Sequence, residues 1–214
     1  DLLVGFKYIA AAIDENGPDK FLFAAEESVG YLAGEYCRDK DACVAALFAL
    51  ELAGELAANG KTPLDRLDEL YLEHGYFHES QFVQVCPGPS GSADIARMMQ
   101  AMRDKTPARL GSAIFETAKD YRRHEIKSLP SNTVIESLPK PSGDLLILEG
   151  QSNSCRVTLA GRPSGTEPKI KFYLFARTAP GVELDEAKSV ARRCLADLEL
   201  ELKQWLISVV KPER

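Results

Sequence analysis

The strictest constraint on the fold is a run of alternating side chains near the carboxy-terminal end of the sequence. Apolar residues alternate with charged or aromatic residues over Ile170–Arg177. A period of two is typical of a strand that lies with one face on a core. A helix with an apolar stripe is predicted to follow, from Leu184 to about Val209. Residues 76–214 are therefore predicted to form an α+β domain, an open antiparallel sheet with helices on one face.

The rest of this domain is predicted from shorter signals. A strand is expected at Tyr76–Cys86, which ends in the turn residues Pro87–Gly91, and two short strands are expected at Leu145–Leu148 and Arg156–Leu159. Methionines at helical spacing predict a helix over Ser92–Arg103 that fills the core. Prolines through Thr106–Pro141 predict an irregular segment.

Residues 1–75 are predicted to form a partial α/β domain. A strand that leads into a short helix is expected over Leu2–Ala12, and a short buried strand over Phe21–Ala24. A helix is expected from Asp41, and its apolar stripe is broad enough for a largely buried helix. Asn59-Gly60 is expected to end that helix, and Thr62-Pro63 to begin the next one.

Composition excludes several classes of protein. The net charge is -6, from 26 basic and 32 acidic side chains, and no strongly basic block occurs. Broad electrostatic binding to nucleic acid is therefore not expected. The longest apolar runs, such as Ala42–Leu50, are far shorter than the ~20 residues of a membrane-spanning helix. Neither a nucleic-acid partner nor a membrane partner is predicted.

The cysteines predict a reducing compartment and no metal site. The five cysteines are odd in number, widely spaced and form no C-x-x-C pair, and the three histidines do not cluster with them. Unpaired thiols in the cytoplasm are expected rather than a disulfide framework or a zinc site. The sequence begins at Asp1 without a methionine or an apolar leader, so we expect a piece of a longer polypeptide.

The segment Arg162–Lys169 lies between two predicted strands and has the side chains of a phosphate-binding loop. An arginine presents a rigid fork of donors, serine and threonine add hydroxyls, glycine allows the backbone to approach an anion, and lysine adds charge. These groups are Arg162, Ser164, Gly165, Thr166, and Lys169 or Lys171. The same residue types also make an ordinary polar turn that caps two strands, so both interpretations stand at this point.

A second polar cluster, Glu26-Glu27-Ser28, follows the predicted strand, with Arg38-Asp39-Lys40-Asp41 beyond a short loop. An ionised carboxylate accepts hydrogen bonds from two neighbouring sugar hydroxyls, and Lys40 can meet a phosphate or pair with Asp39. Adjacent residues on an extended chain face opposite sides, which disfavours Glu26 and Glu27 as a pair for acid–base catalysis. The alternative is an acidic loop that favours the dipole of the following helix.

Taken in order, these motifs resemble the α-D-phosphohexomutase superfamily of phosphoglucomutases and phosphomannomutases. The resemblance is carried by Gly5-Phe6-Lys7, Glu26-Glu27-Ser28-x-Gly30, Arg38-Asp39-Lys40-Asp41 and the stretch from Arg162 to Tyr173. It covers essentially the whole chain, as the carboxy-terminal half of such an enzyme. Ala25 departs from the family pattern, which usually has glycine before the E-E-S motif.

The resemblance implies a partial third, sugar-binding α/β domain at 1–75 and a fourth, phosphate-binding domain at 76–214 with a TATA-box-binding-protein-like fold. Family enzymes interconvert sugar 1-phosphates and 6-phosphates through a phosphoserine and a bisphosphorylated sugar of the glucose 1,6-bisphosphate type. They use Mg²⁺ held by an aspartate-rich loop. Neither that loop nor the catalytic serine loop occurs in this sequence. The resemblance therefore implies no catalytic or metal residue here, and an inactive piece of a mutase.

Roles for individual residues follow from the same resemblance. Glu26 and Ser28 would contact sugar hydroxyls, Lys40 would contact the substrate phosphate or sugar, and Gly5 and Lys7 would line the same cleft. The phosphate that is not being transferred would be bound by the second loop, through Arg162, Ser164, Gly165, Thr166 and Lys171. The implied partners are a phosphorylated sugar and the missing amino-terminal domains of the same protein.

Two alternatives remain open from the sequence. A phosphopentomutase of the same superfamily shares both motifs, so the sugar is not fixed. A non-catalytic phosphosugar-binding module would need only the two loops. An incomplete third domain would also expose a strand edge and apolar surface, which predicts marginal stability or self-association through that edge.

Overall fold

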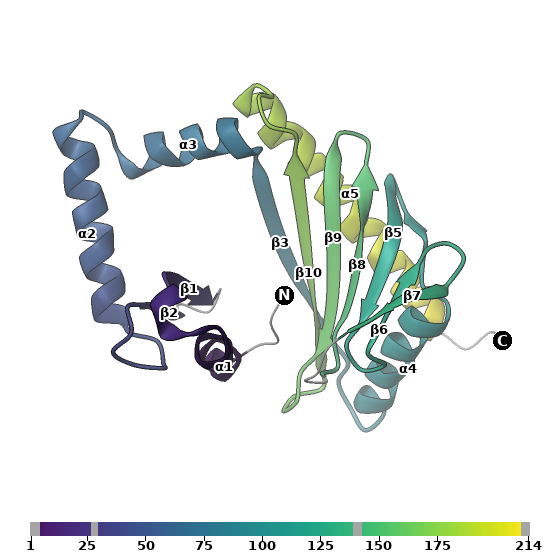
Figure 1. The fold of residues 1–214 in the computed structure, drawn as a ribbon. Coiled ribbons are helices and arrows are strands. Elements are labelled where there is room, and N and C mark those ends of the chain that lie inside the picture. Colours follow the sequence, from purple (N-terminus) through teal and green to yellow (C-terminus); the bar gives the residue numbers. More distant parts are fainter. Residues whose placement is uncertain (1–4, 27–29, 139–142, 211–214) are drawn as a thin grey trace. The chain divides into compact units, whose positions relative to one another are not determined.

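The computed structural model describes residues 5–26, 30–138 and 143–210, and the chain divides into two compact units, 1–68 and 69–214 (Figure 1). Each unit is described by itself. The larger unit is built on an eight-stranded sheet. Its strands are β3 (Phe77–Val85), β4 (Arg109–Leu110), β5 (Ala113–Asp120), β6 (Glu125–Ser128), β7 (Thr133–Ser137), β8 (Leu146–Ser152), β9 (Cys155–Pro163) and β10 (Lys169–Thr178).

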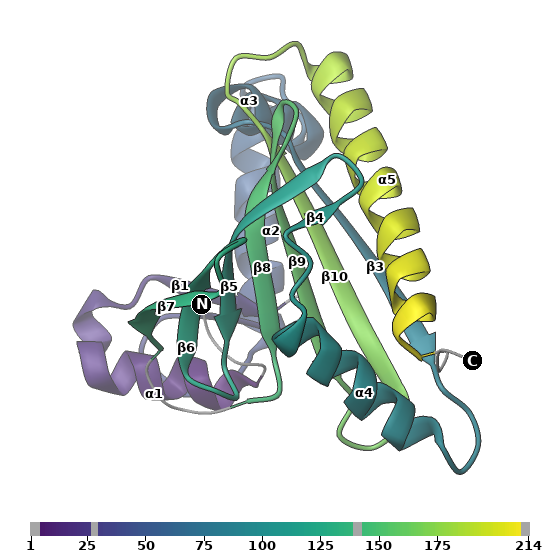
Figure 2. The same cartoon turned by 90° about the vertical axis from the view of Figure 1, so that its right-hand side faces the viewer.

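All strand pairs of this sheet are antiparallel, in the order β3-β10-β9-β8-β5-β6-β7, with β4 paired to β5. Helices α4 (Gly91–Asp104) and α5 (Leu184–Val210) lie on one side of it (Figure 2). The predicted fold class, a partial α/β region followed by an antiparallel sheet with helices on one face, is confirmed.

The core of the larger unit lies between the sheet and these two helices. The alternation on β10 is as predicted, because Ile170, Phe172 and Leu174 are fully buried while Lys171 and Tyr173 lie on the other face. The apolar stripes of the helices supply the other half of the core. Buried helix residues include Ile95, Met98, Met99, Met102, Ala191, Leu195 and Leu198.

The prediction of an irregular segment at Thr106–Pro141 is wrong, since this region contains β4, β5, β6 and β7. A register shift between Phe115 and Thr117 interrupts the alternation of β5, and every residue of β7 is exposed. Neither strand therefore has a clean period of two for sequence reasoning to detect. Pro139 and Pro141 lie outside the described residues.

The smaller unit begins with α1 (Phe6–Asn16), the 3₁₀ turn η1 (Pro18–Lys20) and an antiparallel hairpin of β1 (Phe23–Glu26) and β2 (Gly30–Ala33). A small core joins these elements through Phe6, Ile13 and Leu32. The strand predicted at Phe21–Ala24 exists but lies two residues later, so Glu26 ends a strand rather than starting a loop. Most of the strand predicted before α1 lies outside the described residues.

Helices α2 (Ala42–Ala58) and α3 (Pro63–His74) begin and end at the predicted signals. Asp41 caps α2 by accepting hydrogen bonds from the backbone amides of Cys43 and Val44. Thr62 and Asp65 exchange hydrogen bonds at the start of α3, which makes a capping box.

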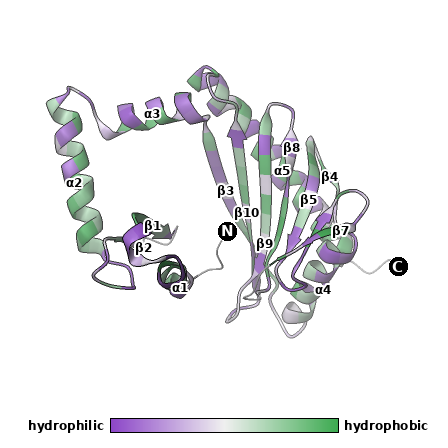
Figure 3. Ribbon diagram, in the orientation of Figure 1, coloured by the Kyte–Doolittle hydropathy of each residue, from purple (hydrophilic) through white to green (hydrophobic). Residues whose placement is uncertain are grey.

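The expected burial of α2 is wrong. Leu56 is its buried residue, whereas Leu47 and Leu50 are 55% and 71% exposed. Apolar residues lie along much of this helix (Figure 3), but a helix without a polar face buries only the side that has a neighbour. Among the described residues no single helix is long and apolar enough to span a membrane. The bent pair of α2 and α3 is together long and apolar enough, by length and composition alone.

Candidate functional site

The hairpin between β9 and β10 places two cations side by side. Arg162 and Lys171 are paired directly across the two strands, on the sheet face away from α4 and α5. Both side chains are half-buried. Neither forms a hydrogen bond or an ion pair with any residue in the described parts of the chain. The pair therefore concentrates positive charge at the base of the hairpin loop.

The loop between these strands keeps part of its backbone available. The amide of Ser164 donates to the carbonyl of Lys169 at 2.9 Å, which closes the loop at its base. The amide of Thr166 is 3.4 Å from Ser164 Oγ. Within the described residues, the amides of Gly165 and Glu167 donate to no protein acceptor. A Cβ at Gly165 would meet nothing within 4 Å, so the space beside this backbone is open.

The negative charge of Glu167, which would repel an anion at this loop, is partly offset by a neighbouring lysine. Its carboxylate lies 2.5 Å from Lys169 Nζ, so the two charges offset each other. The neighbouring Pro168 carbonyl accepts a hydrogen bond from the amide of Cys86 at 2.9 Å. These contacts fix the loop against the end of β3.

Gly91 supports the same loop and was missed by sequence reasoning. A Cβ there would lie 1.8 Å from the carbonyl oxygen of Cys86 and 3.3 Å from Pro168 Cβ. Only glycine allows this close approach. The signal was present as a Gly-Pro-Ser-Gly turn, but a turn alone does not reveal which segment its glycine packs against.

In the smaller unit, Glu26 contacts two of the other predicted sugar-binding residues. Its Oε1 accepts a hydrogen bond from the Gly5 amide at 3.2 Å, and its Oε2 accepts one from Lys40 Nζ at 3.3 Å. The Glu26 side chain is 15% exposed and that of Lys40 is 49% exposed. Lys7 is not joined to this cluster by any described hydrogen bond, since its Nζ lies 5.0 Å from the centre of the Tyr8 ring. Ser28 lies outside the described residues.

The loop between β2 and α2 presents Lys40. The Asp39 carboxylate accepts a hydrogen bond from the Lys40 backbone amide at 2.8 Å, while the Lys40 side chain pairs with Glu26 and not with Asp39. Next along the chain, Asp41 accepts a hydrogen bond from the Tyr36 hydroxyl. That hydrogen bond lowers the pKa of Asp41 and raises the pKa of Tyr36. The carboxylates of Asp39 and Asp41 therefore accept hydrogen bonds from donors within this loop.

Gly30 is a second positioning residue that was not predicted. A Cβ there would lie 2.9 Å from Lys40 Cδ and 3.1 Å from Glu26 Oε2. The contact between the carboxylate and the ammonium group therefore passes directly over the backbone of Gly30. The E-E-S-x-G spacing contained this glycine, but its packing becomes visible only when Lys40 is placed.

Magnesium does not fit the donor set of the described residues. No group of three or more histidine, cysteine, aspartate or glutamate side chains converges there. Mg²⁺ is normally bound through carboxylates, waters and substrate phosphates. The carboxylate of Glu26 is paired with Lys40.

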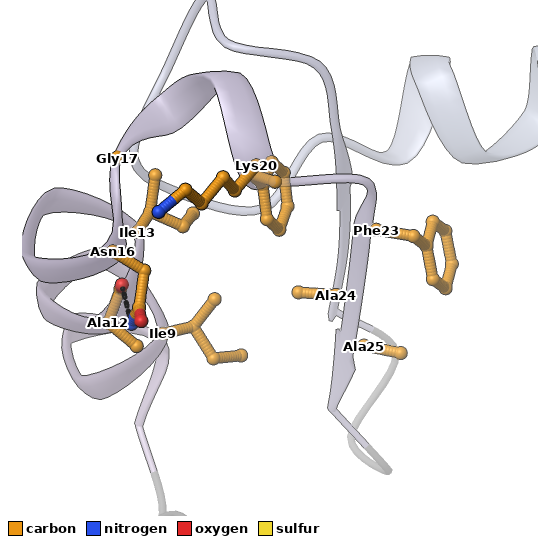
Figure 4. Close-up of a pocket in the computed structure, with 10 residues that line it drawn as sticks. Ile9, Ala12, Ile13, Asn16, Gly17, Lys20, Phe23, Ala24 and Ala25 are labelled. Atoms are coloured by element: carbon orange, nitrogen blue, oxygen red, sulfur yellow. Dashed lines mark hydrogen bonds between the residues drawn. The ribbon is translucent and has the colours of Figure 1, made fainter.

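An open cavity of about 360 Å³ lies between α1, η1 and β1 (Figure 4). Its walls are mainly apolar, with Ile9, Ile13 and Phe23 among them. The amide of Asn16 is bound to the carbonyl of Ala12 at 2.8 Å. Its lining has two polar side chains, Asn16 and Lys20, and this cavity is therefore a weaker candidate than the two polar clusters.

Comparisons with known proteins identify the family of the chain. A family model described as phosphoglucomutase/phosphomannomutase, alpha/beta/alpha domain III, matches residues 1–74. A phosphoglucomutase of Staphylococcus haemolyticus is 35% identical over 178 residues, which cover 81% of this chain and 31% of that protein. Phosphoglucomutases of Staphylococcus epidermidis and Staphylococcus aureus are 34% and 31% identical, again over 81% of this chain and 31% of each relative.

The chain belongs to the phosphohexomutase superfamily, which contains the phosphoglucomutases and phosphomannomutases. It corresponds to a carboxy-terminal part of such an enzyme that includes the third domain, and it spans about a third of the length of these relatives. Likeness to solved structures is weak. The match to the aromatase/cyclase StfQ of steffimycin biosynthesis covers 84% of this chain and 63% of that chain, with 13% identity. Its TM-score of 0.38 is too low to define a shared fold.

Proposed function

We propose that this chain supplies sugar and phosphate recognition to a phosphohexose mutase. Such an enzyme interconverts sugar 1-phosphates and 6-phosphates through a phosphoserine and a bisphosphorylated sugar. The observation that carries the proposal is the cross-strand pair of Arg162 and Lys171, which has no carboxylate partner among the described residues. A phosphoryl group is the anion that a guanidinium fork and an adjacent ammonium group bind best.

The phosphate that is not being transferred binds at the β9–β10 loop. Arg162 donates two hydrogen bonds to its oxygens, and Lys171 adds charge from the neighbouring strand. The hydroxyls of Ser164 and Thr166 and the open backbone at Gly165 complete the set of donors. Because the bisphosphate returns its second phosphate after it turns end for end, the loop must accept two orientations of the sugar.

The sugar binds through the cluster around Glu26. Its carboxylate accepts hydrogen bonds from sugar hydroxyls, while Lys40 shifts from the carboxylate to the substrate. Gly5 holds the carboxylate in place through its amide. Ser28 and Lys7 are assigned to the same role from the family motif.

The chemical step belongs to other domains of the same protein. The sequence has neither the serine loop that carries the phosphoryl group nor the aspartate-rich loop that binds Mg²⁺. The proposed division is a partial sugar-binding domain at 1–75 and a phosphate-binding domain at 76–214. We assign the protein to the cytoplasm, with a phosphorylated sugar as ligand and the amino-terminal domains as partners. Alone, the chain binds phosphosugars without turnover.

Calorimetric titration of the chain tests this function. Glucose 6-phosphate, mannose 6-phosphate, ribose 5-phosphate and glucose 1,6-bisphosphate are compared with unphosphorylated glucose. The proposal predicts binding of hexose phosphates and no binding of glucose at the same concentrations. A preference for ribose 5-phosphate would instead favour a phosphopentomutase, and failure of every phosphosugar to bind would contradict the proposal.

A further inference from the structure

A second pair of opposed cations lies at the other end of the strands that carry Arg162 and Lys171. Arg156 of β9 is paired directly with Arg177 of β10, and both side chains are exposed on the sheet face away from α4 and α5. Arg156 and Arg162 are separated along β9 by about 20 Å of extended strand. The tip of the β8–β9 hairpin and the β9–β10 loop lie at opposite ends of the sheet (Figure 1), so this pair is separate from the candidate phosphate site.

These two arginines line an open cavity of about 410 Å³. Its other walls come from the tip of the β8–β9 hairpin and from the segment that follows β10, and its neutral polar side chains include Gln151, Asn153 and Ser154. No carboxylate belongs to the described residues that line it. The whole chain has 32 acidic and 26 basic side chains, so a cavity with this lining is locally cationic in a protein that is acidic overall.

Two carboxylates on neighbouring strands lie outside this lining. Glu149 precedes Gln151 by two positions on the same face of β8, and its carboxylate accepts a hydrogen bond from Lys119 Nζ at 2.9 Å. Glu79 of β3 is paired with Phe175 across the strands and does not line the cavity. The positive charge of the two arginines is therefore not neutralised by a carboxylate in the cavity wall.

The guanidinium groups of the pair are bound to the protein to different degrees. Nε and Nη2 of Arg177 both donate to the carbonyl of His74, at 3.1 and 2.7 Å, and the guanidinium carbon lies 4.9 Å from the centre of the Phe77 ring. Nη1 of Arg177 donates to no acceptor in the described parts of the chain. Arg156 forms no hydrogen bond or ion pair with any described residue, so its whole fork of donors is available.

Backbone contacts fix the walls of the cavity. The amide of Thr178 donates to the carbonyl of Tyr76 at 3.0 Å, and Thr178 Oγ1 accepts a hydrogen bond from the amide of Tyr76 at 3.0 Å. Beyond the cavity, the amide of Gly181 donates to the carbonyl of Leu72 at 3.0 Å. On the other side, Asn153 has a φ of 46° in the two-residue turn of the β8–β9 hairpin. Walls that are held in place lose less conformational entropy when a ligand binds.

We propose that this cavity binds the diphosphoryl group of a small molecule. The fork of Arg156 binds two oxygens of one phosphoryl group, and Nη1 of Arg177 donates to the second phosphoryl group. Because the two guanidinium groups repel each other, a ligand with two adjacent anionic groups gains more from the pair than a single phosphate does. The amides and the hydroxyl of Gln151, Asn153 and Ser154 offer hydrogen bonds to the rest of the ligand.

The proposed ligand class distinguishes this cavity from the β9–β10 loop. A sugar monophosphate has no second anionic group to bridge the two arginines, so glucose 6-phosphate is expected at the loop and not here. Inorganic pyrophosphate and a nucleoside diphosphate both carry the diphosphoryl group. The volume of the cavity lies in the range of small-molecule pockets. The inference does not depend on the proposed function.

Calorimetric titration of the Arg162→Ala variant tests this site, because that variant lacks the guanidinium fork of the β9–β10 loop. The probes are pyrophosphate, ADP and inorganic phosphate in magnesium-free buffer. Pyrophosphate is expected to bind, and inorganic phosphate is expected to bind more weakly. Tighter binding of ADP than of pyrophosphate would support a nucleotide as the source of the group, and equal or weaker binding would support the diphosphoryl group by itself.

Arg156→Ala, added to Arg162→Ala, should raise the Kd for pyrophosphate by roughly 10-fold or more. Arg156→Lys keeps the charge without the fork and should give a smaller loss. The matched control is Arg193→Ala, which removes an exposed arginine of α5 outside the cavity. Thermal denaturation checks that each variant is folded.

Three results would overturn the proposal. They are the absence of pyrophosphate binding to Arg162→Ala, equal affinity for pyrophosphate and inorganic phosphate, and equal Kd values after Arg156→Ala and Arg193→Ala. No sugar phosphate is used, so failure here is distinguishable from failure of the proposed function.

Discussion

Arg162 and Lys171 stand directly opposite each other on two neighbouring antiparallel strands, and neither has a carboxylate partner among the described residues. Like charges in this position destabilise a strand pair. The sheet therefore holds two cations together at a cost in stability. An anion bound between them would replace this repulsion with two attractive contacts. A substitution that removes one of the charges should therefore weaken anion binding and raise the stability of the ligand-free chain.

Lys171→Gln tests this opposition. Removal of one charge should raise the free energy of unfolding of the ligand-free chain by ~0.2–1 kcal/mol, and it should weaken binding of glucose 6-phosphate. Urea denaturation and calorimetry measure the two effects. The control is Lys119→Gln, because Lys119 pairs with Glu149 at 2.9 Å and its loss should bring no gain in stability. A Lys171→Gln variant that is less stable than the wild type would contradict the account.

Gly30→Ala should disturb the sugar cluster. Its added Cβ would meet Lys40 and Glu26 side-chain atoms at 2.9 and 3.1 Å, so the flexible ends of these side chains must shift. We expect a loss of phosphosugar affinity of roughly 3–10-fold, equivalent to about 1 kcal/mol, with little change in Tm. Gly54→Ala is the matched control, since its Cβ meets nothing within 4 Å inside α2 and alanine favours a helix. Equal affinity for both variants would refute the role of Gly30.

Asp197 should give the larger unit a defined dependence on pH. Hydrogen bonds from the backbone amide and hydroxyl of Ser112, at 2.8 and 2.7 Å, lower the pKa of Asp197. A carboxyl with a lowered pKa stabilises the fold above its unfolded pKa of about 3.9, and this contribution is lost as the pH falls through the folded value.

Asp197→Asn should therefore cost about 1 kcal/mol at pH 7, and the difference from wild type should vanish toward pH 2. Urea titrations at several pH values, in reducing buffer, measure it. Glu201→Gln on the same helix, at a residue with no described hydrogen bond, should be neutral. A destabilisation by Asp197→Asn that stays constant across the pH range would exclude the titration mechanism.

Arg103 and Asp120 form a buried ion pair between α4 and the end of β5. Arg103 Nε lies 3.2 and 3.1 Å from the two carboxylate oxygens. Loss of Arg103 leaves the buried Asp120 carboxylate with only a 3.7 Å contact to Arg123 and hydrogen bonds from two backbone amides, so Arg103→Met should cost up to about 3–5 kcal/mol. Arg97→Met is the control on the same helix, because Arg97 is 55% exposed and its pair with Asp94 should contribute less than ~1 kcal/mol. Equal effects in thermal denaturation would contradict this distinction.

The parts of the fold that the sequence predicted are those with a local signal. Helix boundaries at Asp41, Gly60 and Thr62 depend on caps that lie within a few residues. The alternation on β10 identified a strand because one of its faces packs entirely on the core. The strands between 109 and 137 were missed, since a bulge and an exposed edge leave no regular pattern.

The candidate site was predictable in residue type but not in geometry. The phosphate-like character of the Arg162 loop is visible in the sequence, whereas its pairing with Lys171 depends on strand register. Likewise the Glu26–Lys40 contact joins residues fourteen positions apart and explains Gly30 only after both are placed. A sequence pattern shows which chemical groups lie within a few residues of one another, whereas contacts across strands depend on how the strands pair.

The most direct test of the central claim is the binding of glucose 6-phosphate to Arg162→Ala and Arg156→Ala, measured by calorimetry against the wild type. Both arginines lie on β9, but Arg156 is paired with Arg177 at the far end of the hairpin. The account predicts that Arg162→Ala raises Kd by roughly 10–150-fold, or about 1.5–3 kcal/mol, and that Arg156→Ala leaves it unchanged. An unchanged Kd for Arg162→Ala, or equal losses for the two variants, would contradict it.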